Sequence, residues 1–259
     1  MNKRIRILAA AVAVMMALSL AGCKGGITSA QGAKNSDTVQ WFNNTYAILT
    51  TANGQDVTLV GGMKPGLTAK ASAMVSLEES WDVTDKASAD ETIQWLIDEG
   101  GHRAVFAEEM LYLEELEITK MSDEEILEIM TDVFEMSSEE ATPYLAAIKI
   151  YQRGGEKAID AWDYCRAMSL LGWYYLAEYY TLEETLAKSL ELGQAMQGMY
   201  SSWDEMVESY LDGYSYWAEE DPEDPESYTA QRRKIYEELK AAENSCFHVA
   251  WDTELKLEG

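Results

Sequence analysis

Three polar residues have types that could do chemistry together: His102, Asp163 and Arg166. Asp163 and Arg166 are three positions apart in a segment with helical character, so they would share one helix face and could form an ion pair. If the fold brings His102 to the same pocket, the imidazole could act as an acid or base while the guanidinium clamps an anion. The interpretation that we favour is structural, with the three groups tying helices together across a partly buried seam.

Other familiar catalytic and metal-binding patterns are missing from the sequence. No Gly-x-Ser-x-Gly motif occurs, no Gly-rich phosphate loop follows a strand, and no segment has the spacing of a calcium loop. The two histidines, His102 and His248, supply too few ligands for a Cys/His zinc site. We therefore predict no metal and no cofactor. A disulfide between Cys165 and Cys246 stays open, since two distant cysteines form no framework.

Aromatic residues are the other candidates for binding. Trp162, Trp203, Tyr210 and Trp217 lie in helical segments, where aromatic side chains usually fill the core but can also present a ligand-binding surface. We keep both interpretations for these four residues.

The N-terminus has the order of charges and apolar residues that is typical of an export signal. Lys3, Arg4 and Arg6 precede an uncharged run from residue 7 to 18, which is shorter than the roughly 20 residues of a transmembrane helix. Leu20-Ala21-Gly22-Cys23 then resembles the bacterial lipobox. We predict a signal peptide at residues 1–22, a lipid on Cys23, and a flexible tether at 23–36. The alternative is an ordinary secretory signal beside a chance cysteine.

The charge balance narrows the possible partners. The chain has 46 acidic and 20 basic residues and a net charge of −26, which becomes −29 once the three basic leader residues are removed. Nucleic acid is therefore not an expected partner, because phosphate binding needs a basic surface. An anionic bilayer would also repel the domain, so the lipid on Cys23 would be its attachment to the extracytoplasmic face of the bacterial membrane.

Helix signals dominate the remainder, so we predict a mainly α fold: one irregular multi-helix domain over 37–259 with little or no sheet. Ser122, Ser137 and Thr181 each precede a carboxylate by three residues, as helix caps do. We also expect Ser88 to cap a helix that stops at Gly100-Gly101, and residues 56–60 to be extended or a short strand. Residues 158–180 are apolar on nearly all sides and predict the central buried helix.

Several sequence blocks together resemble the bacterial family called domain of unknown function 1266. The resemblance covers about residues 81–217, and it departs from the family at Tyr179, where members tend to have Gly. The blocks that carry it are Trp81, Gly101-His102-Arg103 with Phe106, Ala161-Trp162-Asp163-Tyr164-Cys165-Arg166, Tyr180 with Leu182-Glu183-Glu184, Ser202-Trp203, and Ser209 to Gly213 with Trp217. The resemblance implies an α-helical domain and no particular mechanism.

These observations favour a lipid-anchored helical module that binds a protein or small ligand through its aromatic residues. A hydrolase-like enzyme around His102, Asp163 and Arg166 is the alternative. A third hypothesis is an immunity or inhibitor protein, because the acidic charge of the chain would complement a basic toxin.

Overall fold

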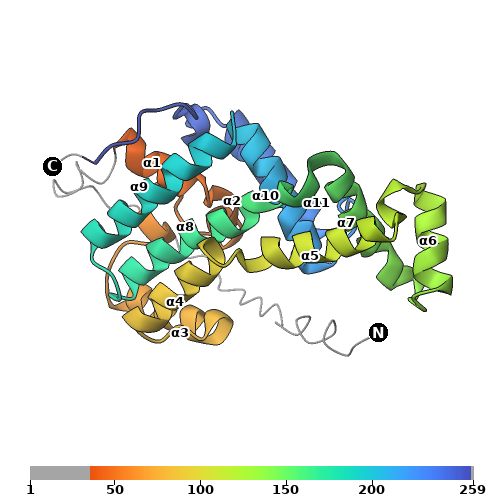
Figure 1. The fold of residues 1–259 in the computed structure, drawn as a ribbon. Coiled ribbons are helices and arrows are strands. Elements are labelled where there is room, and N and C mark those ends of the chain that lie inside the picture. The colour runs from red at the N-terminus through yellow and green to blue at the C-terminus, as the bar shows by residue number, and fades with distance from the viewer. Residues whose placement is uncertain (1–35, 258–259) are drawn as a thin grey trace.

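A computed structural model describes residues 36–257 of the chain, and within that range the protein is α-helical without a strand (Figure 1). The predicted signal peptide, Cys23 and nearly all of the tether lie outside the described residues. The longer helices are α1 (Asp37–Asn44), α2 (Ala47–Ala52), α3 (Leu67–Trp81), α4 (Lys86–Ile97), α5 (Gly101–Glu115), α6 (Asp123–Asp132), α7 (Ser138–Gly154), α8 (Asp160–Leu176), α9 (Leu182–Met199), α10 (Trp203–Ala218) and α11 (Tyr228–Ala241). Short 3-10 turns, η2 (Val60–Gly62), η3 (Ile118–Lys120), η4 (Gly155–Lys157) and η5 (Cys246–His248), connect some of them.

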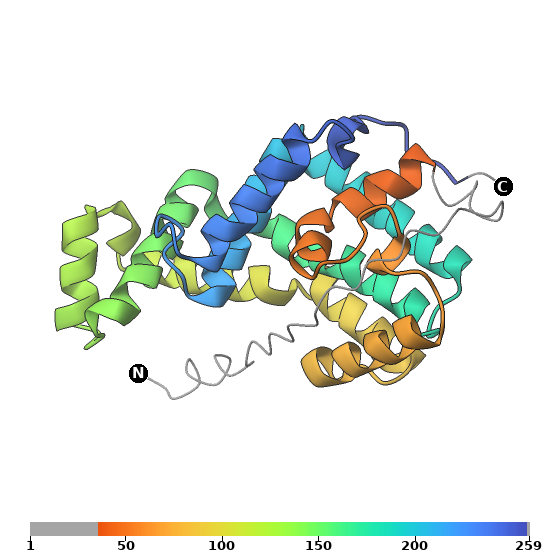
Figure 2. The same cartoon turned by 180° about the vertical axis from the view of Figure 1, so that it is seen from behind.

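Helix α8 is the central element, as its apolar sequence predicts. Helices α3, α4, α5, α9 and α10 all pack on it, so that it runs through the middle of the molecule in both views (Figures 1 and 2). Its residues Leu170, Leu171 and Tyr174 are fully buried. A helix contacted from so many directions needs apolar residues on almost every face, which is why α8 has no polar stripe.

A second, smaller apolar core lies at one end of the molecule. There α6 and α7 pack together, at the right of Figure 1, and α5 extends from the central core to meet them. Phe106 and Met110 of α5 contact Ile126 and Met130 of α6 and Ile148 of α7 in this cluster. The buried apolar side chains of α5 therefore belong to this second core, while its first turn lies against α8.

The helix starts follow the capping rules closely. Ser122, Ser137 and Thr181 each accept a hydrogen bond from the backbone N–H three residues on, and the carboxylate there accepts from the cap's own N–H. Each predicted capping box is therefore confirmed. The cap satisfies N–H groups that have no partner inside the helix.

Three local predictions differ from the structure. Asp85, not Ser88, caps α4. The Asp85 carboxylate accepts a hydrogen bond from the Ser88 N–H, and the Ser88 hydroxyl, at the third helical position, accepts one from the Asp85 N–H. Helix α4 ends at Ile97, and Gly101 is the first residue of α5 instead of the end of α4. Residues 56–60 form turns that lead into η2, and no strand pairs with them in the described chain.

The first helix and the C-terminal tail are fastened to each other. The Trp41 indole donates to the Trp251 carbonyl at 2.9 Å, and the Asn44 amide donates to the Cys246 carbonyl at 2.8 Å. Side chains of α1 therefore satisfy backbone carbonyls of the C-terminal tail, which holds this tail in place although it has little regular structure. Within residues 36–257, no helix combines the length and the apolar character needed to cross a bilayer.

Candidate functional site

The carboxylate of Asp163 lies at the junction of two helices. Asp163 is on the first turn of α8 and has no exposed surface. Its Oδ1 is 2.7 Å from Nδ1 of His102, and its Oδ2 accepts the backbone N–H of Arg103 at 2.8 Å. Both oxygens are therefore engaged by the start of α5.

The start of α5 needs this carboxylate because it has no cap of its own. Gly100 stands at the cap position, where it offers no side-chain acceptor. Asp163 supplies the missing acceptor from another helix and places its negative charge at the positive end of the α5 dipole. Gly101 has a φ of 48°, and a Cβ there would come within 2.9 Å of the Asp163 carboxylate. Only glycine permits this approach without strain.

Arg103 extends the junction to a third helix. Its guanidinium donates to the carbonyls of Leu96 and Ile97 at 2.7 and 2.5 Å, where α4 ends, and Nη1 is 3.9 Å from Asp163 Oδ2. A cation at a helix C-terminus pairs with carbonyls that lack a partner inside the helix. Arg103 therefore joins α4, α5 and α8.

The ion pair that the sequence spacing allowed between Asp163 and Arg166 does not form. Arg166 projects from α8 onto aromatic rings, with its guanidinium carbon 4.9 Å from the Trp81 ring and 5.3 Å from the Trp162 ring. Because Asp163 turns toward the α5 N-terminus, no carboxylate lies within 4 Å of Arg166 in the described chain. Burial is the main cause that lowers the pKa of Arg166.

Trp162 forms the centre of an aromatic cluster beside this junction. Its ring lies 5.6 Å from Tyr210, 5.6 Å from Tyr214 and 5.5 Å from Trp217, all on α10. Gly213 makes this contact possible, because a Cβ at that position would lie 2.3 Å from the Trp162 Cβ. Helix α10 therefore approaches α8 closely, and three of the four predicted binding aromatics come together.

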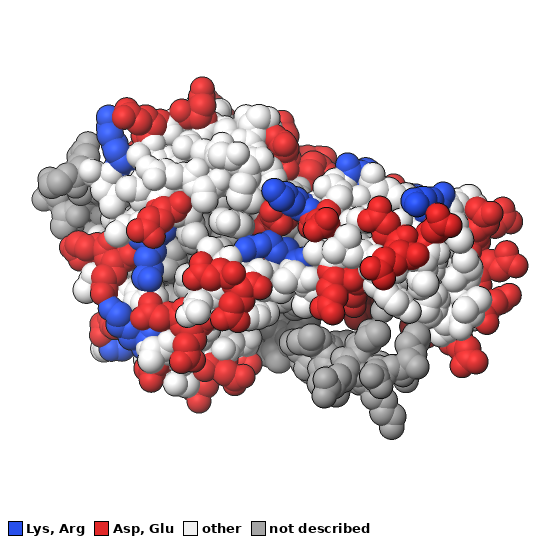
Figure 3. Space-filling model, in the orientation of Figure 1, with Lys and Arg blue, Asp and Glu red and all other residues white. Residues whose placement is uncertain are grey.

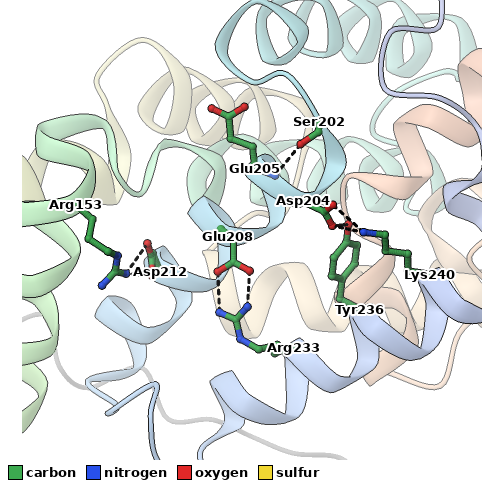
Figure 4. A network of polar contacts seen from close by, with 9 residues as sticks. All are labelled: Arg153, Ser202, Asp204, Glu205, Glu208, Asp212, Arg233, Tyr236 and Lys240. Carbon is green, nitrogen blue, oxygen red and sulfur yellow. Dashed lines mark hydrogen bonds and ion pairs between the residues drawn. The ribbon is translucent and has the colours of Figure 1, made fainter.

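The fourth aromatic, Trp203, belongs to a different cluster. Its ring packs against Trp41 at 5.0 Å, Trp251 at 4.8 Å and Phe247 at 5.4 Å. Beside it is an open hollow of about 430 Å³, lined by Trp203, Tyr236, Phe247, His248 and Trp251 among others. In its wall Asp204 accepts hydrogen bonds from Tyr236 and Lys240 (Figure 4). His248 thus lines this hollow and is not among the hydrogen-bond partners of Asp163.

A row of polar contacts holds α10 between its neighbours near this hollow. Arg233 of α11 makes a two-pronged ion pair with Glu208, and Arg153 of α7 binds Asp212, as Figure 4 shows. Arg153, Arg233 and Glu208 are substantially exposed, so solvent weakens these pairs, whereas Asp212 is only 17% exposed. Their role is to fix the side-by-side position of the three helices.

The arrangement at His102 leaves one ring nitrogen for chemistry. Asp163 occupies Nδ1, so Nε2 is the atom that could exchange a proton with a bound molecule. The nearby thiol is unsuited to attack, because burial raises the pKa of Cys165 far above its usual range. Cys165 and Cys246 are both free, so the disulfide left open by the sequence does not form. Among the described residues, no group of three potential metal ligands is present.

Two residues of this region were missed by sequence reasoning as parts of a site. Arg103 was visible in the Gly-His-Arg block, but only the tertiary structure shows that it, and not Arg166, faces Asp163. Arg232 occurs in a basic run of α11 with no motif around it. It reaches the aromatic cluster, where its guanidinium carbon is 3.8 Å from the Tyr214 ring.

Comparison with known proteins identifies the family. The model of a family described as Protein of unknown function (DUF1266) matches residues 76–251. The chain belongs to this family. No curated protein and no solved structure matches the chain significantly.

The DUF1266 match is longer than the 81–217 stretch in which the sequence blocks are evident. It includes Arg232 and the hollow beside Trp203 as well as the junction around Asp163. The Gly-His-Arg block forms the α5 start, the Trp-Asp-x-x-Arg block forms the facing turns of α8, and Trp217 covers them from α10. These three DUF1266 blocks therefore meet in one place, whereas the Ser202-Trp203 block lies beside the hollow.

Proposed function

We propose that this DUF1266 protein is a lipid-tethered, extracytoplasmic binding module. Its binding surface is the aromatic face, which consists of Trp95, His102, Trp162 and Trp217. Consecutive rings are in contact, with centroid distances of 5.1, 6.1 and 5.5 Å. Trp95 and Trp217 at its two ends are 37% and 38% exposed. This continuous run of contacting rings, exposed at its two ends and buried at Trp162, is the observation that carries the proposal, because aromatic side chains at a rigid helix junction suit recognition.

A site-specific photo-crosslinker tests the aromatic face. A benzophenone residue replaces Trp217 in the membrane-bound protein, and the matched control replaces Val133, which is 69% exposed at the end of α6. We expect a discrete adduct from position 217 and none from position 133. Trp95→Ala should reduce the adduct from position 217, because it removes the far end of the same surface.

Three outcomes would contradict the proposal. Equal labelling from both positions would indicate random collisions, and no adduct at position 217 would indicate that the aromatic face has no partner. An adduct that persists at full strength in Trp95→Ala would place the partner elsewhere.

A hydrolase-like activity is the second candidate, and the His102–Asp163 pair is the observation in its favour. A carboxylate that holds Nδ1 fixes the imidazole tautomer, which is the arrangement that a general base needs. The Trp162 ring contacts both His102 and Arg166. A substrate would therefore have to extend past this ring to contact both side chains. Turnover of ester, amide or phosphoester substrates that is lost in His102→Gln would support this candidate over the binding module.

A further inference from the structure

Buried hydrogen-bond donors without a partner gather in one place. Only six buried side-chain polar atoms in residues 36–257 have no hydrogen-bond partner, and four of them are Trp81 Nε1, Trp162 Nε1, Arg166 Nε and Arg232 Nε. Each of the four is an N–H donor. A buried donor left unpaired costs about 1–3 kcal/mol, so four in one region call for an acceptor that the chain does not supply.

The four donors belong to one cluster. The Arg166 guanidinium contacts both the Trp81 and Trp162 rings, and the Arg232 guanidinium contacts Tyr214. The Trp162 and Tyr214 rings in turn lie 5.6 Å apart. Burial raises the pKa of Tyr210, and the positive charges of Arg232 and Arg166 counteract that rise. We call Arg166 and Arg232 the arginine pair.

The arginine pair lacks the counter-ions that the rest of the protein provides. Arg103, Arg153 and Arg233 each have a carboxylate within 4 Å, whereas neither member of the arginine pair does. This is unexpected in a chain with 46 acidic residues. Two cations that pack on the same group of aromatic rings repel each other, so the absence of a nearby anion is unfavourable.

The acids that act on this cluster are already held by other donors. Asp163 accepts from His102 and Arg103 at the start of α5. Glu220 accepts the Tyr228 and Thr229 backbone N–H groups and the Thr229 hydroxyl in the first turn of α11, whose N-cap is Ser227. Neither carboxylate can turn to the arginine pair without giving up its hydrogen bonds to a helix start.

We infer that the arginine pair and the indole N–H groups of Trp81 and Trp162 form a binding site for an oxyanion that carries two negative charges. A phosphate group or a dicarboxylate has this chemistry. Its oxygens would accept from the guanidinium groups in the paired geometry that arginine favours, and its charge would relieve their repulsion. Arg166 and Arg232 are each only partly buried as residues, and Arg232 Nη1 makes a long hydrogen bond of 3.5 Å to the Tyr228 carbonyl, so the guanidinium groups could turn to an incoming anion. The inference rests on the proposed binding function, since it names a ligand class for the region around Trp162.

Calorimetry and tryptophan fluorescence on the full chain, purified in detergent, test this site. The probes are inorganic phosphate and succinate, with sodium chloride at equal ionic strength as the reference for general salt effects. We expect one or both probes to bind and to change the fluorescence of the indoles that line the site. Arg166→Gln and Arg232→Gln should each weaken binding at least about tenfold, because each removes a charged pair of donors.

Arg233→Gln is the matched control for Arg232→Gln. Arg233 is the adjacent residue of α11, but Glu208 already neutralises it. Binding should therefore change less than about twofold in Arg233→Gln. Arg166→Lys keeps the charge and loses the planar donor set, so it should bind with intermediate affinity and shows whether any loss in Arg166→Gln comes from misfolding.

The outcomes separate the source of the anion and the validity of the site. Preference for phosphate indicates a phosphorylated ligand, and preference for succinate indicates a carboxylate-bearing ligand. No binding of either probe up to about 10 mM, or binding that Arg166→Gln and Arg232→Gln leave unchanged, overturns the inference. If that happens while the crosslinked adduct at position 217 persists, the anion site is wrong and the binding module stands.

Discussion

At the residue scale, one carboxylate decides how three helices meet. Asp163 caps α5 from a neighbouring helix. Arg103 caps the end of α4 and also forms an ion pair with the Asp163 carboxylate. Backbone groups at helix ends have no partner within their own helix, so a buried junction of two ends must import donors and acceptors. The His102–Asp163 pair resembles a catalytic pair, but Asp163 also has the structural role of supplying an acceptor to the start of α5.

Replacing Gly101 with Ala tests this junction. Gly101 and Gly155 both have positive φ values, of 48° and 65°, but only a Cβ at 101 meets the Asp163 carboxylate. Gly155→Ala, where nothing lies within 4 Å, should lose about 1 kcal/mol of unfolding free energy from backbone strain alone. Gly101→Ala should lose about 1–3 kcal/mol more in urea denaturation. Equal losses of unfolding free energy in the two variants would mean that the Asp163 side chain can move away from α5 at little cost.

At the scale of elements, α10 is held by packing on one side and by polar contacts on the other. Gly213 lets it lie closely on α8, and Asp204, Glu208 and Asp212 face basic or hydroxyl groups of α7 and α11 (Figure 4). The apolar contacts fix its distance from α8. The polar contacts fix its rotation, because each requires one particular face to point outward.

The Asp204 contact gives a pH-dependent prediction. Hydrogen bonds from Lys240 and Tyr236 lower the pKa of Asp204 from its ordinary value. A carboxyl whose pKa is lower in the folded state stabilises the protein above its unfolded pKa of about 3.9, and the contribution is lost as the pH falls. Asp204 is 61% exposed, so the contribution should be under about 1 kcal/mol.

Asp204→Asn should therefore lower the unfolding free energy at pH 7, and the difference from the wild type should shrink as the pH falls below about 3.9 and through the lower pKa of the folded state. Urea denaturation at a series of pH values measures this difference. Asp252→Asn is the control, since Asp252 is exposed and has no ion pair within residues 36–257. A difference that stays constant with pH would show that Asp204 contributes through packing instead of charge.

At the scale of the whole molecule, the acidic surface determines how the domain can associate. Asp and Glu side chains cover much of the face shown in Figure 3, with Lys and Arg scattered among them. Such a surface repels an anionic bilayer and disfavours nonspecific contacts. The proposed lipid on Cys23 would then be the attachment of the protein to its membrane, and the partly buried arginine pair would be a local positive site in an otherwise acidic domain.

Replacing Cys23 with Ser tests the anchor. The change removes the thiol that would accept the lipid, so we expect the protein to leave the membrane fraction and appear in the soluble extracytoplasmic fraction. Cys246→Ser is the matched control, because it removes a thiol that forms no disulfide. A Cys23→Ser protein that fractionates with membranes as the parent does would contradict the lipid anchor.

The sequence by itself determined the helical class, the central place of α8, the capped helix starts and the DUF1266 family. These features depend on periodicity and on contacts between residues three or four positions apart, which are local and so are visible in the order of residues. Asp163 and the aromatic residues were also evident as a group, because they stand in compact sequence blocks. The local errors at Ser88 and Gly101 arose where two adjacent residues could each mark a helix boundary.

Only the tertiary structure decided which polar groups meet. Spacing along α8 placed Asp163 near Arg166, but an uncapped helix start on α5 competes for the carboxylate and holds it. Residue spacing also gave no sign that Arg232, on the C-terminal helix α11, packs on the same group of aromatic rings as Arg166. Contacts between distant segments depend on how whole helices pack, and a single residue pattern carries no record of that packing.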